Sequence, residues 1–118
     1  MTKVVCIAPE QLPENLHPEI DYFTVYRRSG NPNVSTVGTG LLYDIDKNGL
    51  SPSLTTWDFT TFALAVSAAD QAVARNQSSD GWTRVMDLSV ALADPAPFQA
   101  IQARLESMLR YLTGDFWS

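Results

Sequence analysis

Side chains that could do chemistry are few and scattered in this chain of 118 residues. His17 is the only histidine, and no Gly-x-Ser-x-Gly nucleophile turn is present for it to serve. Cys6 is the only cysteine, and it lies in an apolar run typical of a buried strand, where a thiol usually behaves as a small hydrophobe. A single cysteine also excludes an internal disulfide and a multi-cysteine zinc site. These residues predict no nucleophile–base pair.

Two glycine-containing segments resemble fragments of ligand-binding loops. Residues 44–49 read Asp-x-Asp-x-Asn-Gly, which matches the opening of a calcium-binding EF-hand loop. The match then fails, because Pro52 lies inside the loop and Thr55 occupies the position of the bidentate glutamate. We interpret the segment as a turn with flanking carboxylates. Residues 38–40, Gly-Thr-Gly, are only part of the phosphate-binding Gly-x-Gly-x-x-Gly motif, so no nucleotide site is predicted.

Asp70 and Arg84 form the most informative pair in the sequence. With 3.6 residues per helical turn, Asp70 lies about 20° from Phe59, within an apolar stripe. Arg84 shares the strand parity of Met86 and so points at the core. Because a core-facing charge is costly unless it meets an opposite charge, we predict an ion pair that locks helix to strand. The alternative is a docking or substrate site, with Trp82 packing on the pair or facing a partner.

These residues would be positioned by three strands, a helix, a strand and a second helix. The predicted elements are strands at 3–8, 20–28 and 34–45, a helix from the Ser53 cap to about Asn76, a loop at 77–81, a strand at 82–92, and a helix from an Asp94 cap to Gly114. Strands followed by helices on one face are typical of an α+β two-layer sandwich. We therefore predict a mainly antiparallel sheet (β-β-β-α-β-α) with two helices on one face.

Apolar spacing predicts which side chains of these elements are buried. The stripe on the first helix comprises Phe59, Phe62, Ala63, Val66, Ala69 and Val73. Trp57 falls on the opposite face of that helix, where an exposed tryptophan often marks an interface. Phe116 and Trp117 follow the second helix, and we expect them to add to the sheet edge, since large aromatic side chains are seldom left in water.

Composition fits one domain over residues 1–118. Apolar residues make up 45% of the chain and charged residues 18%, which is enough apolar material for a core. The net charge is −5, and Arg27-Arg28 is the only basic cluster, so direct nucleic-acid binding is not expected. No secretory signal or membrane-spanning segment is apparent, and the single cysteine fits a reducing compartment. We predict a cytoplasmic location.

Residues 57–117 resemble the N-terminal domain of QueC-like (7-cyano-7-deazaguanine synthase-like) proteins of bacterial anti-phage defence and nucleobase-modification clusters. The matching segments are Trp57-Asp58-Phe59, Ala68-Ala69-Asp70, Arg75, Trp82-Thr83-Arg84, Leu88-Ser89-Val90 and Leu112-Thr113-Gly114-Asp115-Phe116-Trp117. The first fifty residues carry no matching motif. The chain would then be the N-terminal module of a longer protein.

The resemblance implies a non-catalytic recognition or docking domain of an ATP-pyrophosphatase-type protein. The Ser-Gly-Gly-x-Asp-Ser loop and the zinc-binding cysteines of such proteins are absent, so ATP and zinc are expected only in a downstream catalytic domain or on another chain. The expected partner is that domain or another protein of the same defence system, and no membrane. The candidate structural or docking residues are Asp58, Asp70, Arg75, Trp82, Arg84, Asp115 and Trp117.

Two alternatives of other classes stay open. One is a stand-alone small protein-binding or oligomerising domain that uses Trp57 and the terminal aromatic residues. The other, weaker, is a small enzyme with an Asp/Arg site assisted by His17. A longer reading frame that carries the Ser-Gly-Gly-x-Asp-Ser loop would favour the QueC-like interpretation.

Overall fold

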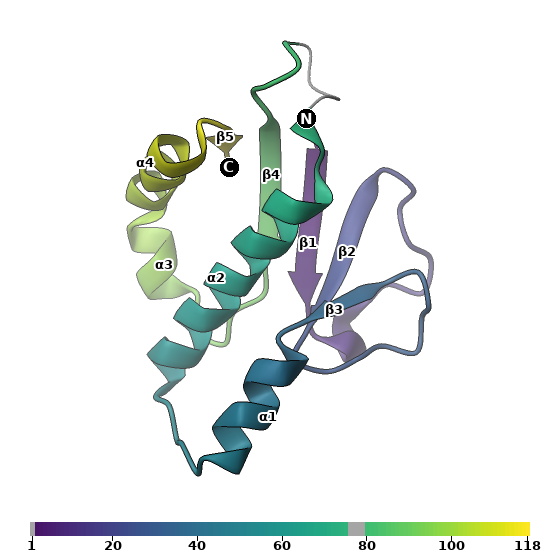
Figure 1. The fold of residues 1–118 in the computed structure, drawn as a ribbon, viewed down its shortest axis with the longest axis vertical. Helices are drawn as coiled ribbons and strands as arrows, with labels where there is room; N and C mark the ends of the chain where they lie inside the picture. Colours follow the sequence, from purple (N-terminus) through teal and green to yellow (C-terminus); the bar gives the residue numbers. More distant parts are fainter. Residues whose placement is uncertain (1, 76–79) are drawn as a thin grey trace.

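A computed structural model describes residues 2–75 and 80–118 (Figure 1). The elements are β1 (Thr2–Ile7), a 3-10 turn η1 (Pro9–Gln11), β2 (Ile20–Val25), β3 (Ser35–Val37), α1 (Thr39–Lys47), α2 (Leu54–Ala72), β4 (Val85–Val90), α3 (Ala96–Ala100), α4 (Gln102–Thr113) and β5 (Phe116–Trp117). The end of the long helix, predicted near Asn76, lies four residues earlier, because α2 stops at Ala72 and Val73 is its C-cap. Most of the loop predicted at 77–81 lies outside the described residues. No helix in the described ranges is long and apolar enough to cross a membrane.

The five strands form one sheet in the order β3-β2-β1-β4-β5, and every pairing is parallel. The predicted mainly antiparallel sheet was therefore wrong. The error lies in the connections, because residues 9–19 were interpreted as a loop and residues 29–33 as a turn. Residues 8–19 can extend for about 40 Å at about 3.3 Å per residue. That length exceeds the roughly 20 Å of a six-residue strand such as β1, so the chain returns to the other end of the sheet without an α-helix.

The helices cover only one face of this sheet in the described part of the chain. The buried cluster joins β1, β2, β4, β5, α2 and α4 through Val4, Cys6, Val25, Ala65, Ala69, Met86, Leu109 and Trp117. Figure 1 shows α2 running across the front of the sheet, with α3 and α4 beside it near β5. The strand order is that of doubly wound folds, but their helices between β1 and β2 and between β2 and β3 are replaced here by loops.

Local signals placed helix ends better than strand lengths. Ser53 caps α2 by accepting the N–H of Thr56, and Gly114 ends α4 with a left-handed φ of 77°, both as predicted. The strand expected at 34–45 was wrong, because β3 stops after three residues and α1 begins at Thr39. The helix expected from Asp94 to Gly114 is broken at Ile101, and its cap is Pro95 rather than Asp94.

The face of α2 that meets the sheet differs from the predicted stripe. Its buried residues are Asp58, Thr61, Ala65, Ala68 and Ala69, whereas Phe59 is 56% exposed. Small side chains allow the helix to lie close to the strands, and the larger side chains turn sideways. The Phe62 ring accordingly lies 6.4 Å from that of Phe98 on α3, measured between centroids.

The terminal aromatic residues do add to the sheet edge, as predicted. Phe116 pairs with Val85 and Trp117 pairs with Met86, and the Ser118 N–H donates to the Met86 carbonyl at 3.0 Å. Trp117 is buried among the core residues, while Phe116 points to the other face and is 52% exposed.

Candidate functional site

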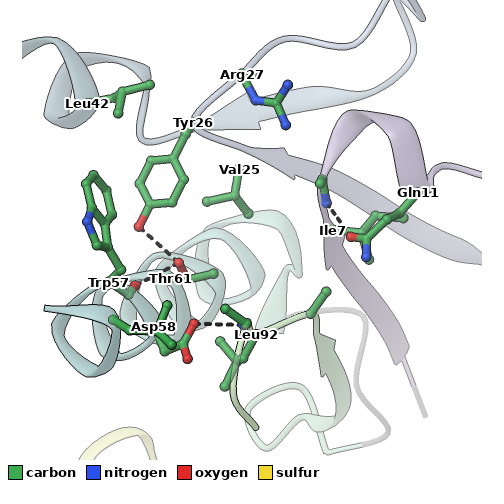
Figure 2. A pocket seen from close by; sticks show the side chains of 14 residues that line it. Ile7, Gln11, Val25, Tyr26, Arg27, Leu42, Trp57, Asp58, Thr61 and Leu92 are labelled. Carbon is green, nitrogen blue, oxygen red and sulfur yellow. Dashed lines mark hydrogen bonds between the residues drawn. The ribbon is translucent and has the colours of Figure 1, made fainter.

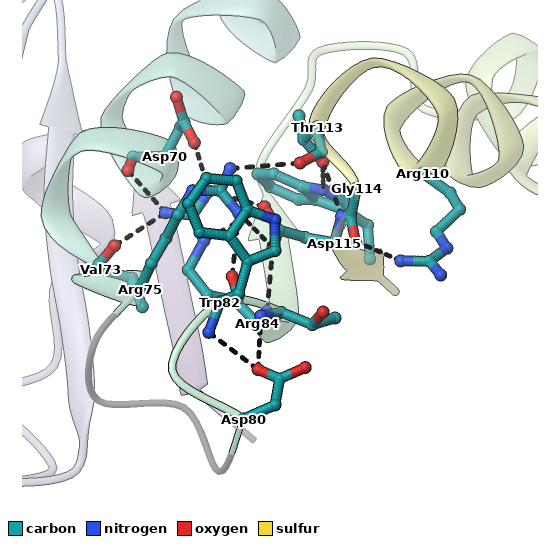
Figure 3. Close-up of polar contacts among 12 residues, drawn as sticks. Asp70, Val73, Arg75, Asp80, Trp82, Arg84, Arg110, Thr113, Gly114 and Asp115 are labelled. Atoms are coloured by element: carbon teal, nitrogen blue, oxygen red, sulfur yellow. Dashed lines mark hydrogen bonds and ion pairs between the residues drawn. The ribbon is translucent and has the colours of Figure 1, made fainter.

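Polar residues gather at two places, one at each end of the strands. At the amino ends of β4 and β5, Arg84 and Asp115 are both buried, with 3% and 0% exposure (Figure 3). Arg84 Nε and Nη2 donate to Asp115 Oδ2 at 3.1 and 2.7 Å. Arg84 Nη1 donates to the carbonyls of Asp70 and Val73 at 2.8 and 2.7 Å, and Nη2 also binds the Asp70 carboxylate. The Arg84 guanidinium therefore caps the carboxyl end of α2.

Asp115 is satisfied from several directions. Its Oδ1 accepts the Arg84 backbone N–H and Arg75 Nη1, each at 2.9 Å. Burial acts to raise the pKa of Asp115, but the hydrogen bonds from Arg84 and the charges of Arg84 and Arg75 outweigh it and hold the pKa below its usual value. The hydrogen bond to Asp115 likewise raises the pKa of Arg84. Both groups are charged at neutral pH.

The predicted Asp70–Arg84 ion pair is confirmed, but its setting was misjudged. The Asp70 side chain is 47% exposed rather than in the centre of a buried stripe, and the buried partner of Arg84 is Asp115. Trp82 is 68% exposed, and the Arg75 guanidinium carbon lies 5.3 Å from the centroid of its ring. Trp82 thus packs on this cluster from the outside.

The arrangement of this cluster is that of a lock between elements. It joins the end of α2, the start of β4, the end of α4 and the start of β5, because Arg75 also donates to the carbonyls of Trp82 and Thr113 at 3.1 and 3.2 Å. All five guanidinium N–H directions of Arg84 have an acceptor. Ligands of open parallel sheets bind beyond the carboxyl ends of the strands, and this cluster lies at the amino ends.

Asp58 is separated from the other candidate residues. It precedes Asp70 by 12 positions on α2, a distance of about 18 Å at 1.5 Å per residue. Asp58 is 4% exposed, and its two carboxylate oxygens accept the backbone N–H groups of Ala93 and Asp94, each at 2.9 Å. It fixes the segment after β4 to the first half of α2.

A crevice with a volume of about 390 Å³ opens beside Asp58 (Figure 2). It is lined by Ile7, Ala8, Gln11, Val25, Tyr26, Arg27, Leu42, Leu54, Trp57, Asp58, Thr61, Ala91, Leu92 and Ala93. These residues come from the carboxyl ends of β1, β2 and β4 and from the facing turns of α1 and α2. The crevice therefore lies where the chain leaves β1 for one side of the sheet and returns on the other side as β4, the switch point at which such sheets bind ligands.

Tyr26 holds an unusual backbone conformation at the rim of this crevice. Its φ is 67°, the only positive φ at a non-glycine residue among the described residues. The Tyr26 N–H donates to the Val37 carbonyl at 2.7 Å, and its hydroxyl lies 3.0 Å from Thr61 Oγ1. Its ring meets Trp57 edge to face, with centroids 5.3 Å apart. Trp57, expected to point away from the core, in fact lines the crevice.

Sequence reasoning missed this crevice because it depended on the strand directions. Because the sheet is parallel, the segments that follow β1, β2 and β4 must meet at the same end of the sheet. These segments are residues 8–11, 26–27 and 91–93. The only local signals were the end of the first strand at Pro9 and the aromatic Trp57 near the start of the helix. Neither signal identifies a site unless the strand order is known.

The residues considered first for chemistry occupy other surroundings. Burial raises the pKa of the Cys6 thiol to about 12, so it is not a nucleophile. His17 Nδ1 accepts the N–H of Glu19 at 3.1 Å within its loop. Residues 44–47, interpreted as part of a turn, belong to α1. No group of three or more His, Cys, Asp or Glu side chains that could hold a metal occurs within residues 2–75 and 80–118.

Comparisons with family models, with curated proteins and with solved structures gave no match to this chain.

Proposed function

We propose that this chain is a non-catalytic recognition domain of a QueC-like protein in bacterial anti-phage defence, working in the cytoplasm. The domain docks onto the ATP-pyrophosphatase-type catalytic domain, which would carry the ATP and zinc sites. The observation that supports this proposal most directly is a parallel sheet with helices on only one face. Parallel sheets are almost always covered on both faces.

The uncovered face has the composition of an interface between domains. On β1, β4 and β5 it presents Lys3, Val5, Val85, Asp87, Ser89 and Phe116, which alternate with the buried residues of the same strands. Val85 is 45% exposed and Phe116 is 52% exposed. Lys3 and Asp87 are register partners on neighbouring strands. Such a mixture of apolar and charged groups suits an interdomain contact, which is more polar than the core of an obligate dimer.

The large exposed surface area of the chain also supports a partner that covers the open face of the sheet. The chain exposes 7619 Å². A monomer of this 13.0 kDa mass usually exposes about 6,300 Å², so the excess is about 1,300 Å². A partner in a standard protein–protein interface loses about 800 Å². The smallest dimension of the molecule, 23 Å, is that of two layers rather than three. One more layer on the open face would remove about 800 Å² of this excess.

The test measures binding of the purified chain to a QueC-like catalytic domain that carries the Ser-Gly-Gly-x-Asp-Ser loop, using calorimetry. We expect Val85→Lys and Phe116→Lys to weaken binding at least tenfold, since each places a charge on the open face within the contact. Tyr111→Lys is the matched control, because Tyr111 is 88% exposed on α4, on the helical side, and its substitution should leave binding unchanged.

Two outcomes would contradict the proposal. In the first, both lysine variants bind as the unsubstituted chain does. In the second, the chain alone sediments as a dimer that Phe116→Lys dissociates, which would assign the open face to a second copy and favour the oligomerising alternative.

A further inference from the structure

We propose that the crevice at the carboxyl ends of β1, β2 and β4 binds a neutral planar nitrogen heterocycle, up to the size of a nucleoside, through a ring N–H group that donates to Asp58. This binding site is independent of the open sheet face, because it lies beyond the carboxyl ends of the strands rather than on the uncovered side of the sheet. Two features of the fold bring it about: the switch of strand order between β1 and β4, and the first turns of α2 beyond the strand ends.

The walls of the crevice suit a flat, largely apolar molecule. Figure 2 shows Trp57 and Tyr26 on one side and the aliphatic side chains of Val25 and Leu92 nearby. The volume of about 390 Å³ lies within the range of small-molecule sites. The backbone of Tyr26 is strained at its φ of 67°, and strain of this kind concentrates at ligand sites. Its three contacts, to Val37, Thr61 and Trp57, hold the aromatic wall in place before a ligand arrives.

A hydrogen-bond acceptor and a hydrogen-bond donor both line the crevice. Each Asp58 oxygen accepts one backbone N–H, and a carboxylate oxygen has about two acceptor positions, so acceptor capacity remains for a ligand N–H. Arg27 uses Nη2 to bind both oxygens of Glu10, at 2.9 and 3.0 Å. Its Nε and Nη1 have no acceptor in the part of the chain that the structure describes, and they can donate to a ligand carbonyl. A heterocycle that carries both an N–H and a C=O group offers a hydrogen-bond partner to each of these residues.

The loop after β1 argues against a phosphate. Phosphate sites at this position use a run of free backbone N–H groups supplied by glycine-rich turns. Here Pro9 has no N–H, and the Ala8 N–H already donates to Gln11 Oε1 at 2.9 Å. Glu10 adds a negative charge beside Arg27. The site therefore selects a neutral molecule rather than its phosphorylated form.

An NMR titration of the ¹⁵N-labelled chain tests this proposal with inosine, 1-methylinosine and inosine 5′-monophosphate. Inosine carries adjacent N–H and C=O groups, and 1-methylinosine lacks the N–H. We expect inosine to shift the amide signals of Ala8, Arg27 and Ala93 saturably. 1-Methylinosine should bind about tenfold more weakly, the effect of one lost hydrogen bond to a charged group. The monophosphate should also bind more weakly than inosine.

Variants separate the site from general effects on folding. Asp58→Asn should reduce the preference for inosine over 1-methylinosine. Leu92→Trp should fill the crevice and abolish binding with Asp58 still in place. Leu112→Trp is its control, since Leu112 is 68% exposed on α4, and it should leave binding unchanged. Three results would each overturn the proposal: no shifts up to about 10 mM inosine, well above a 1 mM dissociation constant; equal binding of 1-methylinosine; or tighter binding of the monophosphate.

Discussion

At the scale of residues, one buried arginine organises the amino ends of the last two strands. Arg84 could be recognised in the sequence as a core-facing charge, because its strand parity matches that of the apolar Met86. Asp70 could be chosen as its partner from the helical angle alone. Asp115 could not be paired with Arg84, since the two are brought together only when β5 lies beside β4. Local periodicity reveals an unpaired charge, but the partner depends on the strand order.

The two carboxylates around Arg84 should therefore differ in their contribution to stability. Asp115→Ala leaves Arg84 buried beside a single, half-exposed carboxylate, and we expect it to lower the free energy of unfolding by about 3–5 kcal/mol. Asp70→Ala removes a partner whose side chain is 47% exposed, and solvent screening limits its cost to about 1 kcal/mol or less. Urea unfolding measures both values. Equal losses would show that Asp115 is not the principal counter-charge.

The same carboxylate sets an acid limit on stability. The pKa of Asp115 in the folded chain lies below its ordinary value of 3.8, so the ionised form is favoured by folding. This contribution is fully present above the unfolded pKa and is lost as the pH falls through the folded pKa. We expect the thermal midpoint to fall as the pH drops below about 4. Asp115→Asn should be less stable at neutral pH and show a shallower fall; an unchanged slope would assign the acid sensitivity to other groups.

At the scale of elements, two helix ends could be predicted from the sequence and the strand directions could not. Ser53 and Gly114 act through their own neighbours, so their roles follow from local chemistry. Strand directions depend instead on where residues 8–19 and 26–34 cross, and no local pattern records this. The alternation in strand 82–92 correctly indicates one buried and one open face. In most proteins that pattern belongs to antiparallel sheets, so the open face itself contributed to the wrong assignment.

The junction between β3 and α1 provides a test at this scale. Gly38 has a φ of 85°, and a Cβ at this position would lie 2.8 Å from Leu64 Cδ1 and 3.1 Å from Tyr26 Cδ1. Gly38→Ala should therefore destabilise the fold by about 1–3 kcal/mol through backbone strain and displacement of Tyr26. Gly40→Ala is the control, because nothing lies within 4 Å of its added Cβ and it lies inside α1. It should be neutral or stabilising by up to about 1 kcal/mol. Thermal denaturation measures the stability of both variants, and equal losses of stability would contradict this account.

At the scale of the whole molecule, the two ends of the sheet have different roles. The amino ends of β4 and β5 carry a saturated ionic lock, and the carboxyl ends of β1, β2 and β4 carry an open crevice. We expect a ligand in the crevice to leave the Arg84 cluster undisturbed, because most of the length of α2 separates the two. The uncovered face of the sheet lies between them and leaves room for a third layer.

The short last strand connects these parts, so its removal tests the whole arrangement. Deleting residues 116–118 removes Trp117 from the core and uncovers Met86, which is fully buried. The loss of a buried tryptophan costs about 3–5 kcal/mol. Deleting residues 115–118 also removes the buried partner of Arg84, so this longer deletion should lower the melting temperature further. Phe116→Ala is the control, because its side chain is half exposed and it should change the melting temperature little. If both deletions melted like the full chain, β5 would not be part of the cooperative unit, and the lock at Arg84 would be held by α2 alone.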